Sequence, residues 1–222
     1  MELTLFDLDG TLLAIDSDHA FGEFMVELGW VEGEEHRRRN DEFYVQYQAG
    51  RLDIHAYIGF ATAPWRDRAA AELDAAMARF VRERILPAVH DSALALVRRH
   101  REAGDLLAVV TATNDFITRP IADLFGVPVL IATELERDAS GRATGTIRGV
   151  AAFREGKIAR VRQWLQAQGR ELGEFSRSTF YSDSTNDLPL LEQVSHPVAT
   201  NPAPALEAIA AARGWPIIRL FE

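Results

Sequence analysis

Two aspartates near the N-terminus have the spacing and setting of a catalytic pair. Asp7 and Asp9 follow a largely apolar run at residues 3–6 that is typical of a buried strand, and Gly10 ends the run with turn chemistry. In an open α/β sheet, ligands bind beyond the carboxyl ends of the strands. Two carboxylates about 4 Å apart repel by about 4 kcal/mol at an effective dielectric near 20. A hard divalent cation is the natural compensation for that repulsion.

A second polar group follows the apolar run at residues 106–110. Thr111, Thr113 and Asn114 stand between that expected strand and a helix beginning at Asp115, so hydroxyl and backbone N–H groups there can hold an anion. In isolation, the same residues would more often form a plain helix N-cap.

A third group follows the expected strand at residues 178–182. Asp183 could bind a cation from the strand end, while Asp187, on the first turn of a helix, could bind it or orient a bound water. Asp187 could instead only complement the helix dipole. The spacing Asp-x-x-Asn-Asp, taken with Asp7 and Asp9, favours the cation site.

Lys157 is the single lysine among 24 basic residues. Arginine would serve an exposed salt bridge equally well, whereas a compact ammonium beside a phosphate oxygen differs from a planar guanidinium. One stray lysine needs no reason, but we favour a functional role at the start of a helix.

The pattern along the chain predicts an α/β protein with a Rossmann-like, doubly wound parallel sheet and an inserted all-helical segment. Residues 16–87 carry helical spacing and no convincing strand, and their aromatic residues are expected mostly to form a small core of their own. Residues 1–15 and 88–222 are expected to form the catalytic core. Further strands are expected at 127–132, 196–200 and 217–220, helices at 66–85, 186–193 and 204–213, a helix capped by Asp91 or Ser92, and a hairpin within 138–149.

Composition narrows the function. The net charge of −9 argues against nucleic acid, and the arginines at 37–39 are flanked by acids, which indicates a solvated helix face. The absence of cysteine excludes disulfides and thiol catalysis. No apolar stretch reaches the roughly 18 residues of a membrane span, so we expect no membrane association and a cytoplasmic location. The oligomeric state stays open.

The segment Asp7-Leu8-Asp9-Gly10-Thr11-Leu12 resembles the first signature of the haloacid dehalogenase-like phosphohydrolases, and three later segments resemble the others in order. The overall order is similar to the phosphoserine phosphatase-like branch, whose helical cap is inserted between the first and second signatures. The resemblance therefore implies that residues 16–87 form an all-helical cap. The resemblance implies that Asp7 is a nucleophile that accepts the phosphoryl group, and that Asp9 protonates the leaving oxygen and later activates water.

The same resemblance implies roles for the other groups. Thr111 and Lys157 would steady the transferring phosphoryl group. Mg²⁺ would be bound by the carboxylate of Asp7, the backbone carbonyl of Asp9 and Asp183, with support from Asp187.

The substrate implied is a small phosphorylated metabolite, for which phosphoserine and histidinol phosphate are candidates by analogy. The chain departs from the usual Ser-Gly-Gly at the second signature, because Thr111-Ala112-Thr113 is bulkier near the phosphate. Thr113 and Asn114 are expected to contact substrate. Asp16 stands near the place of a cap acid, and Arg51 approximates a cap arginine that would meet a substrate carboxylate.

Three other functions remain open. The chain could transfer the phosphoryl group to an acceptor other than water. It could be a receiver-like domain that only accepts phosphate on an aspartate, although Asp9 and the helices at 16–87 argue against that. A catalytically silent binding module is the least favoured, because all four signatures retain their reactive residues.

Overall fold

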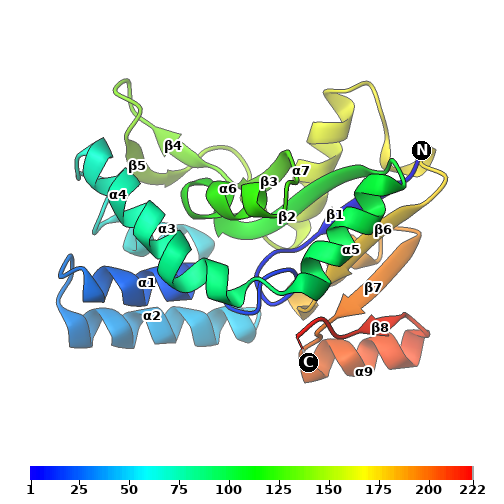
Figure 1. Ribbon diagram of the computed structural model, residues 1–222, viewed down its shortest axis with the longest axis horizontal. Coiled ribbons are helices and arrows are strands. Elements are labelled where there is room, and N and C mark those ends of the chain that lie inside the picture. Colours follow the sequence, from blue (N-terminus) through cyan, green and yellow to red (C-terminus); the bar gives the residue numbers. More distant parts are fainter. Residues whose placement is uncertain (222) are drawn as a thin grey trace.

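A six-stranded parallel sheet forms the centre of the computed structural model, which describes residues 1–221 (Figure 1). Its order is β3-β2-β1-β6-β7-β8, and every neighbouring pair is parallel. The strands are β1 (Leu3–Phe6), β2 (Leu106–Asn114), β3 (Val129–Thr133), β6 (Ser178–Ser182), β7 (His196–Thr200) and β8 (Ile217–Ile218). Because β1 lies inside the sheet, between β2 and β6, the residues that follow it reach the middle of the carboxyl edge.

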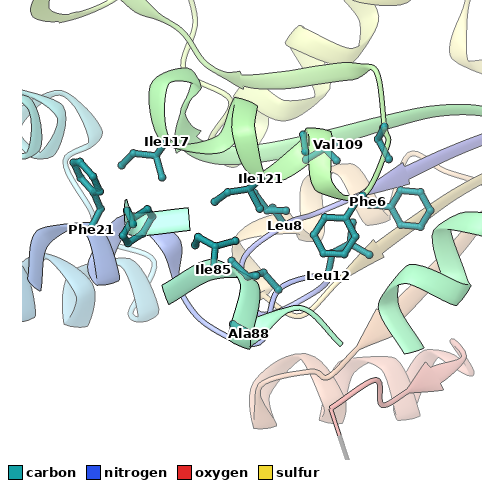
Figure 2. Close-up of a cluster of buried hydrophobic side chains, with 14 of the residues drawn as sticks. Phe6, Leu8, Leu12, Phe21, Ile85, Ala88, Val109, Ile117 and Ile121 are labelled. Atoms are coloured by element: carbon teal, nitrogen blue, oxygen red, sulfur yellow. The ribbon is translucent and has the colours of Figure 1, made fainter. Parts of the chain in front are cut away.

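Helices cover both faces of the sheet, as alternating side chains on β1 require. Leu3 and Leu5 join a buried cluster with side chains of α7 (Glu155–Gln166), α8 (Leu188–Leu191) and α9 (Pro204–Arg213). Phe6 joins the cluster on the opposite face, with side chains of α5 (Asp91–Glu102) and α6 (Asp115–Leu124), part of which Figure 2 shows. The predicted doubly wound α/β class is confirmed.

Four helices follow β1 and lie beside the sheet, at the blue and cyan end of Figure 1. They are α1 (Ser17–Glu27), α2 (Gly33–Gln48), α3 (Ile54–Thr62) and α4 (Ala70–Phe80). Phe21 and Phe24 of α1 are buried, with ring centroids 5.0 and 5.4 Å from that of Phe80. The aromatic residues of α1 therefore form core, but this core is continuous with the cluster that contains Phe6 and is not the separate small core that was expected.

A small antiparallel hairpin, β4 (Leu135–Arg137) and β5 (Ala143–Ile147), lies against this helical segment. Arg66, which follows α3, donates from Nη1 to the backbone oxygen of Thr144 at 3.2 Å. The predicted hairpin region is therefore present and supports the helices from the side of the sheet.

Several predicted boundaries were wrong. The strand expected to end before Thr111 continues to Asn114, with a shift in its register against β3 after Val110. The helix expected at 66–85 is shorter, because α4 gives way to a π-helical turn (Val81–Ile85) and a 3₁₀ turn (Leu86–Ala88) before the chain returns to the sheet.

Other predicted boundaries differ in smaller ways. The helix expected at 186–193 is a 3₁₀ turn (Thr185–Asp187) followed by the single turn of α8, and the last strand stops at Ile218. His90, and not Asp91 or Ser92, is the N-cap residue of α5, and it makes no side-chain cap bond. Across residues 1–221, no helix has both the length and the apolar character needed to cross a membrane.

Candidate active site

Asp7 and Lys157 form a buried ion pair at the carboxyl edge of the sheet. Asp7 follows β1 directly, and Lys157 lies in the first turn of α7. The ammonium Nζ donates to Asp7 Oδ1 at 2.8 Å and to Asp187 at 2.8 Å, and both Asp7 and Lys157 are at most 3% exposed. Burial alone would lower the pKa of Lys157, but Asp187 and Asp7 raise it, so this lysine is a permanent cation.

One cation for two carboxylates leaves the centre short of positive charge. Burial raises the pKa of Asp7 even though Lys157 opposes the shift, and it raises the pKa of Asp187 to about 6 against the same opposition. Asp187 also accepts a hydrogen bond from Ser182 Oγ at 2.7 Å. Asp187 thus holds Lys157 in place toward Asp7.

Asp9 lies where the chain turns away from β1. Its Oδ1 accepts from the backbone N–H of Ser17 at 2.8 Å, and its Oδ2 accepts from Thr113 Oγ1 at 2.9 Å. Burial, with a contribution from Asp16, raises the pKa of Asp9 to about 7. A carboxyl group with that pKa can give a proton and take one back near neutral pH.

Asp183 approaches the first turn closely because residue 10 is glycine. A Cβ on Gly10 would lie 2.4 Å from Asp183 Oδ2, and its φ of +73° also favours glycine. Asp183 Oδ1 accepts from Thr11 Oγ1 at 3.1 Å, and Asn201 Nδ2 donates to the carbonyls of Gly10 and Thr11 at 3.0 and 3.1 Å. Burial, then Asp7 and Asp187, raise the pKa of Asp183 well above its usual value.

The second signature is placed on β2. Thr111 is buried and lines the pocket with Thr113, and its Oγ1 accepts from the backbone N–H of Thr113 at 3.2 Å. Asn114 is fully buried and caps α6 by accepting from the N–H of Ile117 at 3.3 Å. Asn114 is absent from the pocket lining, so its geometry matches the simple N-cap and not the substrate contact we expected.

The two expected cap residues differ in placement. Asp16 lines the pocket and caps α1 by accepting from the N–H of His19 at 2.8 Å. Arg51 is exposed and does not line the pocket. An arginine at the end of α2 therefore does not reach the site as the sequence suggested.

The pocket includes residues that the sequence had not singled out. Asp18 lines it, as do aromatic side chains that we had expected to pack mostly among themselves, namely Phe43, Tyr44, Tyr47 and Tyr57. Three further side chains do not line the pocket but donate hydrogen bonds to the acidic residues or to the turn beside them: Thr11 to Asp183, Ser182 to Asp187, and Asn201 to the carbonyls of residues 10 and 11. The one available signal was the position of Thr11 and Ser182 immediately beside the two acidic motifs.

The groups around Asp7 suit a magnesium ion, although no three acidic or histidine side chains within residues 1–221 form a metal cluster by themselves. The implied ligands are two carboxylates, Asp7 and Asp183, and the backbone carbonyl of Asp9. Mg²⁺ commonly binds through one or two carboxylates and keeps several waters or phosphate oxygens. Burial, with smaller contributions from neighbouring aspartates, raises the pKa of Asp7 and of Asp183, and a bound divalent cation would favour the charged form of both carboxyl groups.

Comparison with known proteins agrees with this geometry. Residues 4–192 match the family model for haloacid dehalogenase-like hydrolases. The chain is 43% identical over 216 residues to a histidinol-phosphatase of Neisseria meningitidis serogroup C, covering 97% of each protein. It is 30% identical over 221 residues to a phosphoserine phosphatase of Mycobacterium tuberculosis, covering 96% of this chain and 68% of that protein.

Solved structures show the same fold. A protein of unknown function from Bordetella pertussis Tohama I superimposes with a TM-score of 0.93 at 48% identity, over 99% of each chain. A substrate-bound phosphoserine phosphatase superimposes with a TM-score of 0.68 at 18% identity, over 99% of this chain and 92% of that one.

The chain therefore belongs to the haloacid dehalogenase-like hydrolase family, as the four signatures predicted. Within that family it is a phosphoric monoester hydrolase with a phosphoserine phosphatase-like fold.

Proposed function

We propose that this enzyme is a Mg²⁺-dependent phosphatase that hydrolyses a small phosphorylated metabolite through an aspartyl-phosphate on Asp7. The observation that carries the proposal is the single ammonium of Lys157, held 2.8 Å from both Asp7 and Asp187 at the carboxyl edge of the sheet. It orients the nucleophile and places a positive charge where a phosphate dianion must arrive. Histidinol phosphate is the first substrate to test, because of the relative that is named for it.

The reaction divides into two steps at the side chains described. In the first, a carboxylate oxygen of Asp7 bonds to phosphorus, the bond to the ester oxygen breaks, and Asp9 donates its proton to the leaving alcohol. In the second, Asp9 takes a proton from water as that water attacks phosphorus, which releases inorganic phosphate and restores Asp7. A raised pKa near 7 suits Asp9 to both transfers.

The remaining residues bind and orient. Thr111 would donate to a phosphoryl oxygen, and Lys157 would neutralise charge that develops during transfer. Mg²⁺ bound by Asp7, the carbonyl of Asp9 and Asp183 would supply charge neutralisation and a template for the phosphate. Asp187 would act through Lys157.

We also propose that residues 16–87 act as a cap that closes over a core made of residues 1–15 and 88–222. Two hydrogen bonds join the end of α2 to the core. Asn186 Nδ2 donates to the carbonyl of Tyr47 at 2.9 Å, and Arg154 Nη1 donates to the carbonyl of Gly50 at 3.0 Å. A closed cap would exclude water from the first step. We also place the enzyme in the cytoplasm, as the sequence favours.

Asp7→Asn tests the proposal. The variant should lose all measurable turnover of histidinol phosphate with Mg²⁺ while it keeps a folded far-UV spectrum, because an amide cannot serve as the nucleophile. Asp123→Asn, which removes an exposed charge on α6, should behave like the wild type. Substantial Mg²⁺-dependent turnover by Asp7→Asn would refute the mechanism.

A further inference from the structure

The part of the pocket built by α1, α2 and α3 is acidic and aromatic. It is lined by Asp16 and Asp18, and by the rings of Phe43, Tyr44, Tyr47 and Tyr57. Because the same pocket reaches Asp7 and Thr111, a phosphate ester bound at Asp7 would direct its leaving group toward these side chains. Their chemistry therefore bears on which alcohol the enzyme releases.

Asp18 is a buried carboxylate without a cation beside it. It is 8% exposed, and its hydrogen-bonding neighbours are neutral: the hydroxyl of Tyr57 and Asn114 Nδ2, the latter at 3.5 Å. Burial, then the charges of Asp16 and Asp9, raise the pKa of Asp18 well above its usual value. A positive group placed next to Asp18 would supply the missing counter-charge.

Positive charge is also scarce in the rest of the pocket. Among the described residues, no arginine lines it, and the ammonium of Lys157 is already held by Asp7 and Asp187. His19 lines the pocket but pairs with Asp41 at 2.8 Å. A substrate carboxylate would therefore meet carboxylates and no free cation, whereas an ammonium or imidazolium would meet carboxylates and aromatic faces that attract cations.

We propose that Asp18, oriented by Tyr57, binds a protonated nitrogen of the leaving group, and that the enzyme selects phosphorylated amino alcohols against phosphorylated amino acids. This selectivity rests on the proposed function, because it describes the leaving-group side of the same phosphatase site. Asp18 is a specificity residue here, and it takes no part in phosphoryl transfer.

The first test compares substrates that differ by one group. Phosphoserine is phosphoethanolamine with an added carboxylate, and glycerol phosphate carries no cation. We expect kcat/KM for phosphoethanolamine to exceed kcat/KM for phosphoserine by at least about tenfold, and histidinol phosphate to exceed glycerol phosphate by a similar factor. Phosphoserine hydrolysed as well as phosphoethanolamine would overturn the proposal and leave the phosphatase activity standing.

The second test assigns the selectivity to Asp18. Asp18→Asn keeps the shape and removes the charge, so the ratio of kcat/KM for histidinol phosphate to that for glycerol phosphate should fall by about 10- to 100-fold, mainly through KM. Asp67→Asn removes the same charge from an exposed side chain between α3 and α4, and should leave the ratio unchanged. An unchanged ratio in Asp18→Asn would overturn the assignment.

A binding measurement separates this proposal from the proposed function. Histidinol carries the cationic groups and no phosphate, so its affinity can be measured by calorimetry with the wild type and with Asp18→Asn. Binding that weakens about tenfold or more in the variant supports recognition of the cation even if no ester is hydrolysed. Equal binding to both proteins, or no binding to either, would contradict it. Failure of every phosphate ester to turn over would instead count against the phosphatase mechanism.

Discussion

Lys157→Arg keeps the charge of the single lysine and changes its shape. Elsewhere the chain uses arginine for every basic residue, so a general need for positive charge does not explain the lysine. Its ammonium is 1–2% exposed and lies 2.8 Å from both Asp7 and Asp187. A planar guanidinium in the same space would have to displace one or both of these carboxylates.

The expected losses of kcat and stability in Lys157→Arg follow from the geometry of its two ion pairs. At 2.8 Å and an effective dielectric near 20, each ammonium–carboxylate pair has an attraction of about 6 kcal/mol before desolvation is subtracted. Overpacking a buried site costs about 1–3 kcal/mol, which a protein with 5–15 kcal/mol of stability survives. Misplacing one preorganised charge at the phosphoryl group should lower kcat by about 100- to 1000-fold.

The assay is steady-state hydrolysis of histidinol phosphate with Mg²⁺, together with denaturant unfolding of the same samples. Arg98→Lys, an exchange at an exposed position of α5, is the matched control and should change neither quantity. Lys157→Met removes the charge altogether and should cost about 3–5 kcal/mol of stability, because two buried carboxylates lose their partner. A Lys157→Arg variant with kcat within about threefold of the wild type would refute the reasoning.

Three further perturbations test the acidic centre. Asp183→Asn should raise the Mg²⁺ concentration needed for half-maximal activity at least about tenfold, measured by metal titration after chelation, and an unchanged requirement would remove Asp183 from the metal site. Gly10→Ala should lose about 1–3 kcal/mol more stability than Gly104→Ala. Both glycines have a positive φ, but only at Gly10 would the new Cβ lie 2.4 Å from Asp183. Equal losses of stability in denaturant unfolding would contradict this contact. Folding raises the pKa of Asp9 to about 7 and of Asp187 to about 6, so these groups bind protons more tightly when folded than unfolded. The metal-free protein should therefore gain stability as the pH falls from about 7 toward the ordinary carboxyl range, and added Mg²⁺ should weaken this trend. Thermal unfolding with and without Mg²⁺ across that range measures it, and stability that falls over the same interval would contradict the burial argument.

The parallel sheet and its acidic edge could be predicted because they depend on local patterns. The apolar run before Asp7 is short and is followed by Gly10, a combination that favours a buried strand over a helix, and the structure buries it in the sheet. The carboxyl ends of parallel strands meet at one edge of the sheet, which predicts Asp183 and Thr111 beside Asp7.

The side chains that line the pocket around Asp18 could not be predicted in the same way. Which face of a helix meets the pocket depends on how α1, α2 and α3 pack, and helical spacing alone does not distinguish an aromatic residue in a core from one that lines a cavity. Phe21 proved to be core, whereas Tyr57 lines the pocket. The substrate contact predicted for Arg51 depended in the same way on packing. Arg51 follows α2, which lines the pocket, but its own side chain is exposed.

The most direct test of the central claim is to trap the phosphoryl group on the protein. Asp9→Asn keeps the backbone carbonyl that would bind Mg²⁺, but it can neither protonate the leaving oxygen nor activate water. An ester with a good leaving group, such as p-nitrophenyl phosphate, needs little protonation in the first step, so with this ester mainly the second step should be slowed. Acid quenching of this variant with Mg²⁺ and p-nitrophenyl phosphate, followed by peptide mass spectrometry, should find one added phosphoryl group on Asp7. A phosphoryl group found on another residue, or none found while the wild type turns over the same ester, would contradict the account.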